Sequence, residues 1–319
     1  MRITFSNQGS LSSFNRFAES LDFSDPRNLE IILDENWTSM NPAQLVLAAA
    51  LAVKVGKTNT RIIGTLPASV AYLTHMGLYD FISTPSPIQN KAEPSGRFVP
   101  ITSIKTSFDQ TKFITDIIPL LHLNEKNSRI LSYLIGELVR NTLEHAYSKD
   151  GAFVAAQYNK NTNHICFAIC DTGIGLWRSL KIWKPKTDEE ALSLALTPGI
   201  SGTTLKEGGT SDNAGAGLFF TKSIVKISKG HFVIYSGNAS YTLLKQRPDL
   251  VKTKLFANPF DDPHSFINTA PRFDGTLVAF DFSLDATDEF QTLLNQIGIV
   301  YESAIEARKK SKVRKPNFI

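Results

Sequence analysis

Strand and helix signals alternate along the first ninety residues, and this alternation limits the fold more than any other feature of the chain. Residues 29–34, LEIILD, have the composition of a buried strand. The run NPAQLVLAAALAVKVG then predicts a helix with Pro42 in its first turn and Gly56 at its end. A second strand is expected at 61–64 and a second helix at 67–82. Strand, helix, strand and helix with short connections predict a small α/β domain.

The composition changes after Ile82, where STPSPIQNKAEPSG is rich in Pro, Ser and other polar residues. Such a stretch is typical of a linker or surface loop. A chain of 319 residues is long enough for two domains. We therefore expect a first domain at 1–90, a linker at 91–107, a second domain at 108–285, and a C-terminal helix with a basic tail at 286–319.

The second domain is expected to be an α/β unit with two helices near its start. Helices are predicted at 109–121, 125–147, 218–230 and 285–310, and strands at 151–158, 164–171, 231–237, 240–245 and 275–284. The glycine-rich segment 173–216 is predicted to be loop-like or mixed. Residues 246–272 are interpreted as an insertion with little regular structure.

Several classes of protein are disfavoured by composition. The apolar run at 45–53 is far shorter than the roughly 20 residues that span a bilayer, and the N-terminus lacks the apolar core of a signal peptide. A cytoplasmic location is therefore expected.

The two cysteines, Cys166 and Cys170, would lie roughly 13 Å apart on one face of a strand, too far for a disulfide. They are interpreted as buried thiols. The basic run Arg308 to Lys315 is interpreted as a solvated end, and nucleic acid is not the expected partner. The alternative is a scaffold that uses this basic tail as a contact for nucleic acid or an acidic partner.

One helix carries a polar stripe in the sequence GELVRNTLEHAY. Glu137, Asn141 and His145 are spaced four residues apart and therefore share one face. Asn141 offers a neutral oxygen that suits a magnesium ion, and Glu137 is placed to polarise a water or hydroxyl. Taken alone, the stripe fits an exposed face of an amphipathic helix equally well.

Two glycine-rich motifs follow this helix. In DTGIG, Asp171 ends an apolar strand and offers an acceptor for an exocyclic amine beside a backbone that accommodates a flat ligand; a turn-forming Asp is the other interpretation. In GAGL, Gly215 and Gly217 precede a helix, and exposed N–H groups at such a helix start suit a phosphate. A flexible glycine-rich loop would give the same pattern.

Taken together, the motifs resemble the GHKL ATPase superfamily, the Bergerat-fold ATP-binding module of sensor histidine kinases and anti-sigma-factor kinases. ELVRNTLEHAY is similar to its N box, DTGIG to its G1 box and NAGAGLFFTKSIVK to its G2 box, while Gly275 and Thr276 match a late Gly-Thr pair. The match covers roughly residues 108–284. It implies an α/β sandwich with a mixed sheet and helices on one face.

The resemblance implies a role for each matched residue, with ATP and Mg2+ as cofactors. Asn141 would be the magnesium ligand and Glu137 the catalytic or water-orienting acid. Asp171 would read adenine. The remaining implied contacts are Gly173, Gly175 and Thr276 around adenine, and Gly215, Gly217 and Leu218 at the phosphates. The segment before Gly215 would be the ATP lid, and His145 would act as a supporting residue.

The N-terminal region more weakly resembles STAS domains, the fold of anti-sigma-factor antagonists, through its element order and the close MGLYDFI. Thr38 and Ser39 are displaced from that family's phosphorylation site. The chain is thus expected to be an ATP-binding regulator with a protein partner, and a homodimer is left open. It would either hydrolyse ATP or phosphorylate a partner on Ser/Thr, or act as a nucleotide-switched module or scaffold without turnover. No histidine has the context of a phospho-acceptor, so a histidine autokinase is not expected.

Overall fold

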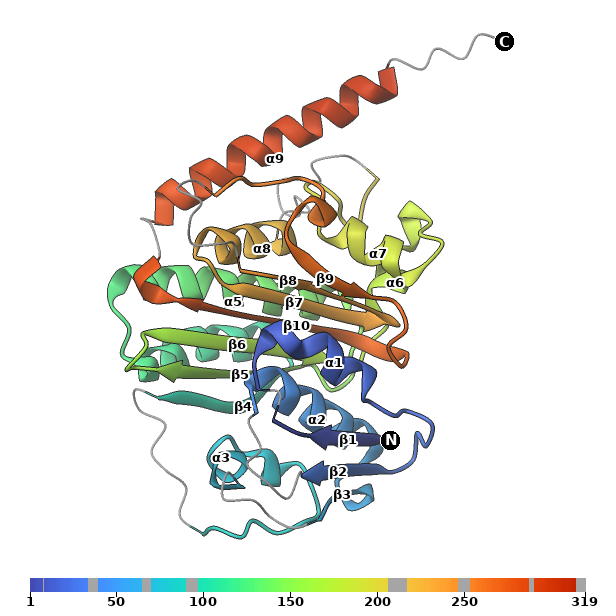
Figure 1. The fold of residues 1–319 in the computed structure, drawn as a ribbon, viewed down its shortest axis with the longest axis vertical. Helices are drawn as coiled ribbons and strands as arrows, with labels where there is room; N and C mark the ends of the chain where they lie inside the picture. The colour runs from blue at the N-terminus through green and yellow to red at the C-terminus, as the bar shows by residue number, and fades with distance from the viewer. Residues whose placement is uncertain are drawn as a thin grey trace.

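The computed structural model describes residues 1–7, 9–33, 40–64, 70–89, 97–205, 217–245, 253–286 and 290–313. Within these ranges the chain is a mixed α/β protein with two sheets, one of three strands and one of seven. Figure 1 shows the smaller sheet beside the larger one, with helices between them and on the far side of the larger sheet. Thr38 and Ser39 lie outside the described residues.

The three-stranded sheet is parallel and contains the two predicted N-terminal strands, together with an edge strand that the sequence did not predict. Its order is β1 (Arg2–Phe5), β2 (Leu29–Leu33) and β3 (Thr60–Ile63), with Phe5 opposite Leu33 and Leu29 opposite Thr60. The short helix α1 (Phe14–Glu19) connects β1 to β2, and α2 (Pro42–Val55) connects β2 to β3. Parallel neighbours need such crossover connections, so the predicted α/β alternation of this region is confirmed.

Helix α2 begins and ends as its sequence predicts. Asn41 caps the helix through the backbone N–H of Gln44, and the Gln44 side chain accepts from the Asn41 N–H in return. Pro42 occupies the first turn, and Gly56 ends the helix at a φ of 92°. Every residue from Pro42 to Ala52 is buried, which requires neighbours all around the helix.

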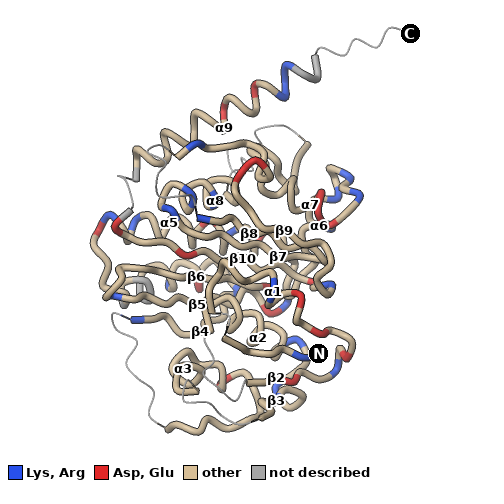
Figure 2. The backbone as a smooth tube through the Cα atoms, in the orientation of Figure 1, with Lys and Arg blue, Asp and Glu red and all other residues tan. Residues whose placement is uncertain are grey.

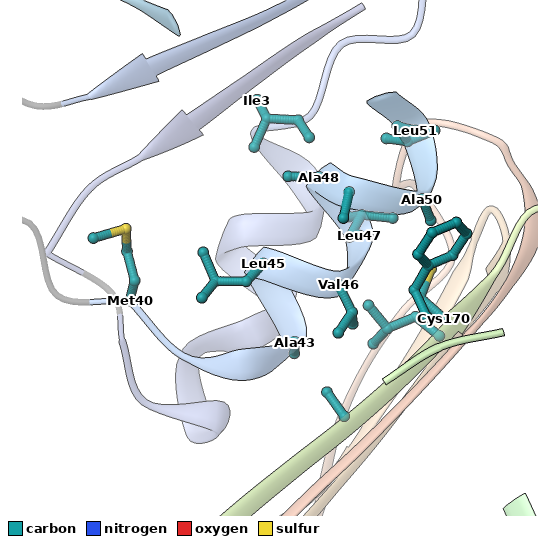
Figure 3. Close-up of a cluster of buried hydrophobic side chains, with 14 of the residues drawn as sticks. Ile3, Met40, Ala43, Leu45, Val46, Leu47, Ala48, Ala50, Leu51 and Cys170 are labelled. Atoms are coloured by element: carbon teal, nitrogen blue, oxygen red, sulfur yellow. The ribbon is translucent and has the colours of Figure 1, made fainter. Parts of the chain in front are cut away.

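Those neighbours come from both sheets. Figure 3 shows Leu45 and Ala48 directed towards the side of Ile3, while Val46 and Ala50 face the strand that carries Cys170. One continuous hydrophobic cluster joins β1, β2, α1 and α2 to the near face of the large sheet. The two sheets therefore share a core through α2.

The predicted helix at 67–82 is wrong as a single element. The described part forms α3 (Val70–His75) and a separate 3₁₀ turn at Leu78–Asp80. Gly77 lies between them at a φ of 79°, a left-handed conformation that ends a helix. Residues 65–69 lie outside the described ranges.

The seven-stranded sheet is antiparallel at every described pairing, so the expected mixed sheet is corrected. Its strands in spatial order are β4 (Phe98–Ile104), β5 (Ala152–Asn159), β6 (His164–Asp171), β10 (Phe273–Ser283), β7 (His231–Gly237), β8 (Ala239–Leu243) and β9 (His264–Ile267). Hairpins join β5 to β6 and β7 to β8, and β10 enters between the two hairpins with the opposite direction to both neighbours.

Both outer strands lie where the sequence predicted none. Strand β4 lies within the segment interpreted as a linker at 91–107, and it pairs with β5 from Phe98 opposite Gln157 to Ile104 opposite Ala152. Strand β9 lies within the segment interpreted as an insertion at 246–272. Pro100 interrupts the β-branched and aromatic residues of β4, and β9 has only four residues, so neither segment shows a clear strand pattern.

Helices cover both faces of the large sheet, whereas one covered face was expected. Helix α5 (Glu125–His145) and α8 (Gly217–Ile227) pack on one face together with apolar residues such as Val154 and Phe280. Helices α1 and α2 cover the other face, where Phe153 and Ala279 point. All seven residues of β7 are buried as a result, and Figure 2 shows the strands of this sheet almost free of charged residues.

The remaining helices surround the sheet ends. They are α4 (Ser107–Lys112), a π-helical turn at Phe113–Ile117, a 3₁₀ turn at Ile118–Leu121, α6 (Gly175–Ser179), α7 (Asp188–Ala195) and α9 (Phe290–Val313). The predicted helix at 109–121 therefore changes type after Lys112. Helix α9 packs Tyr301 against Phe219 and Phe220 of α8, and Arg308 donates to the carbonyl of Pro198.

Two further predictions concern the cysteines and the membrane. Cys166 and Cys170 are free thiols next to the cluster around α2, with Cys170 fully buried, and burial raises the pKa of both. Among the helices in the described ranges, none is long and apolar enough to cross a bilayer.

Shortening one buried side chain of α2 tests whether this helix joins the two sheets into one core. Leu47→Ala removes a fully buried side chain, and we expect a loss of about 2–5 kcal/mol in the free energy of unfolding, with fluorescence and circular dichroism changing in one transition. Ile299→Ala is the control, because its side chain is 67% exposed and its cost should stay below about 0.5 kcal/mol. Separate unfolding of the two sheets would contradict the shared core.

Candidate functional site

Helix α5 presents the predicted polar stripe beside an apolar face. The helix begins at Asn124, whose side chain accepts from the backbone N–H of Asn127. Its buried residues pack on the large sheet and are Asn127, Ile130, Leu131, Leu134, Ile135, Leu138 and Val139. Glu137, Asn141 and His145 are only partly buried, which places the stripe along the flank of the helix.

Asp171 lies at the end of β6, directly opposite Thr276 of β10. Only 2% of its surface is exposed. Its carboxyl group accepts from the backbone N–H of Gly173 at 2.8 Å and from the backbone of Thr276. Burial raises the pKa of Asp171 to about 7, although both hydrogen bonds favour the charged form. The site thus contains a buried acid that is poised between its two protonation states near neutral pH.

The turn after Asp171 docks on the end of α5. Ile174 N–H donates to the carbonyl of Ala146 at 2.8 Å. A Cβ at Gly173 would lie 1.9 Å from that carbonyl oxygen, so only glycine allows this approach. This contact fixes Asp171 relative to the helix that carries Asn141.

Helix α8 approaches α5 through its first residue. A Cβ at Gly217 would lie 2.8 Å from Asn141 Nδ2 and 2.9 Å from Glu137 Oε2. Gly217 therefore lies directly against the polar stripe, and the absence of a side chain makes the contact possible. The start of α8 and the stripe of α5 form one edge of the site.

A cavity of about 140 Å³ lies between these elements. Its lining includes six of the predicted contacts and also His145; the six are Asn141, Asp171, Gly175, Gly217, Leu218 and Thr276. Glu137 and Gly173 do not line it, and Gly215 lies outside the described residues. Apolar walls come from Leu138, Ile169, Ile200 and Val278.

Glu137 forms an ion pair with a residue that was not among the predicted site residues. Arg140 Nη2 lies 2.7 Å from Glu137 Oε2, and Arg140 itself lines the cavity. The spacing of three residues on a helix is the signal that predicts such a pair. The charge of the acid is thus balanced beside the cavity by its neighbour on the helix.

His145 is the last residue of α5 and lies at the C-terminal end of the same polar stripe. Burial lowers the pKa of His145, against the opposing effect of Glu144, whose Oε2 lies 3.8 Å from His145 Nε2. The imidazole is therefore neutral at pH 7. It lines the cavity as a hydrogen-bonding group rather than as a cation.

The wall opposite α5 was not predicted, because the segment 173–216 was interpreted as loop-like or mixed. Helix α7 begins after Thr187, whose side chain accepts from the Glu190 N–H, so the sequence TDEE contains a recognisable capping signal. Ser236 of β7 accepts from Leu176 N–H and donates to the Gly275 carbonyl. This hydroxyl ties α6 to β10 beside the cavity.

A buried ion cluster holds α8 in place. Lys222 and Lys226 both donate to the carboxylate of Asp262, and the three side chains are at most 4% exposed. Burial lowers the pKa of Lys222, with Asp262 opposing this shift. The helical spacing of the lysines was visible in the sequence, but their partner lies 40 residues away from Lys222.

The donor set of the cavity suits a hydrated metal more than a protein-caged one. In the described part of the chain, no group of three or more His, Cys, Asp and Glu side chains is arranged to hold a metal ion. Asn141 offers an amide oxygen, which Mg2+ accepts as a ligand when water and phosphate oxygens supply the rest.

Comparison with known proteins adds no family assignment. No protein-family model matches the chain, and a search of curated proteins finds no match. The site is therefore interpreted from its own geometry.

Replacing Asp171 by Asn should change how stability depends on pH. Because the folded-state pKa is about 7 and the ordinary value 3.8, the stabilising effect of the protonated group is fully present below about pH 4 and is lost as the pH rises through 7. Relative to Asp171→Asn, the wild type should lose about 1.4 kcal/mol per pH unit within this window. Urea unfolding from pH 4 to pH 8 measures the difference, and a constant difference would contradict the raised pKa.

Proposed function

We propose that the chain binds Mg-ATP in the cavity between α5, β6, β10 and α8, as a regulatory protein of the GHKL type. The observation that carries the proposal is the fully buried acceptor Asp171 at the same cavity as Asn141 and Gly217. Three motifs that are separated in the sequence contribute to this cavity. Their order matches the N, G1 and G2 boxes described above.

Adenine recognition would use Asp171 and the apolar walls. The Asp171 carboxyl group accepts from the exocyclic amine, and Thr276 lies opposite it across the β6–β10 pair. Ile169 and Val278 offer apolar surface to a flat base. Binding of an amine donor favours the ionised form of Asp171, whose burial otherwise favours the neutral form.

The phosphate end would lie at the start of α8. This helix of eleven residues begins at Gly217, and N–H groups at a helix start attract anions. Asn141 would hold Mg2+, which when bound supplies neutralisation of phosphate charge. Arg140 also lines the cavity, where its charge is balanced by Glu137.

The proposal has two forms: in the first, Glu137 activates a water or a hydroxyl and ATP is turned over, and in the second, ATP is bound without turnover. The pairing of Glu137 with Arg140 supports the second form. Glu137 lies behind Gly217, outside the cavity lining, and its Oε2 is already occupied by the guanidinium. A carboxylate in this state is poorly placed to activate a water or a hydroxyl. In this form ATP acts as a switch that changes which protein partner is held, with negligible turnover.

Isothermal titration with ATP and Mg2+ tests nucleotide binding. We expect binding by the wild type and a roughly tenfold to hundredfold weaker affinity for Asp171→Asn, since an amide NH₂ faces the exocyclic amine where an acceptor is needed. Asp274→Asn is the matched control, because Asp274 is 53% exposed and does not line the cavity. Equal affinity of wild type and Asp171→Asn would refute the adenine role.

Phosphate release separates the two forms. If Glu137 activates water, Glu137→Ala should lower the rate by about 10²–10⁴-fold. If ATP is only a switch, wild type and Glu137→Ala should both release phosphate at the background rate while binding ATP. The Glu137–Arg140 pair leads us to expect the second result. Fast release that depends on Glu137 would show that the pair opens during turnover.

A further inference from the structure

A second and larger cavity lies at the opposite end of the β5–β6 hairpin. Its volume is about 770 Å³. It lies between α3, the start of β4, the tip of the hairpin and the turn at Leu121 and His122, in the region of Figure 1 where α3 faces β4. The hairpin tip and Asp171 lie at opposite ends of β6, roughly 23 Å apart at about 3.3 Å per residue.

The charge of this cavity is one-sided. Arg97 and Lys160 carry permanent positive charge, and His75 and His122 add two imidazoles, whereas none of the described lining residues carries a carboxylate. The side-chain amides of Gln157, Asn159 and Asn161 add hydrogen-bond donors. A concave surface lined by one sign of charge concentrates ligands of the other sign.

The walls are held by direct contacts between the N-terminal region and the large sheet. Tyr72 of α3 donates to Gln157 Oε1 at 3.0 Å. His75 stacks on Phe98 with ring centres 6.4 Å apart, and Ile101 N–H donates to the Met76 carbonyl at 2.9 Å. The cavity is therefore a formed space between fixed elements.

We propose that this basic cavity binds a small polyanion that carries phosphate or carboxylate groups. Arg97 offers a planar fork of N–H donors that matches either group, and Lys160 adds a point charge from the hairpin tip. Because the lining comes from both α3 and the large sheet, a bound polyanion bridges the two regions and stabilises their contact.

Calorimetric titration of the full chain with pyrophosphate, and separately with citrate, tests the site. We expect saturable binding of at least one probe and an affinity about tenfold or more weaker in the double variant Arg97→Gln/Lys160→Gln. Lys112→Gln, an exposed lysine outside the cavity, should bind as the wild type does. Binding of pyrophosphate alone identifies phosphate as the ligand group, and binding of citrate alone identifies carboxylate.

The double variant itself locates the probe, because Arg97 and Lys160 line this cavity and neither lines the proposed nucleotide site. Arg97 and Lys160 are exposed, so the double variant should fold, and its thermal unfolding without probe checks this. The proposal is overturned if neither probe binds saturably or if the double variant binds with unchanged affinity.

Discussion

Burial of α2 between the two sheets is the interaction on which the rest of the structure depends. A helix with the run LVLAAALAV is apolar on all sides. It has no face to turn towards water, so it needs cover from every direction. The three-stranded sheet covers one side and the large sheet the other. The same contact gives the large sheet its second covered face, which explains why every residue of β7 and β8 is buried.

This arrangement brings the N-terminal region close to the proposed nucleotide site. Successive residues of a strand point to opposite faces. Cys170 belongs to the cluster around α2, while the next residue, Asp171, lines the cavity on the side of α5. A change of charge or position at Asp171 is thus one residue away from the packing that joins the two sheets. If nucleotide alters the hold on a partner, β6 offers a short physical route.

The sequence allowed prediction of the features that depend on local patterns. Asn141 lies on a helix with a clear apolar period, and Asp171 ends a strongly apolar strand, so their elements were assigned correctly. Strand β4 was missed because Pro100 interrupts its pattern, and β9 because four residues give too short a pattern to recognise. The second helical face of the sheet was missed because no local pattern says which surface α2 will cover.

The same distinction separates the predicted site residues from those that were missed. Residues such as Asn141 and Thr276 were found because each belongs to a short motif. Arg140 is adjacent to Asn141, but its role arises from a rotamer that points to Glu137. The role of Asp262 could not be predicted, because its partners Lys222 and Lys226 are remote in sequence and approach it only when the chain folds.

The Lys222–Asp262–Lys226 cluster shows how such a remote residue bears on the site. One carboxylate neutralises two buried ammonium groups only in part. Removal of Asp262 would leave Lys222 without this acceptor and Lys226 with only the carbonyl of Lys254, a strongly destabilising change. The cluster ties α8 to the segment that carries Asp262. Because α8 begins at Gly217, in contact range of Asn141 and Glu137, we expect the cluster to help position the helix start against the polar stripe. A buried salt bridge outside the motifs thus contributes to the geometry of the proposed phosphate end, beside the glycines within them.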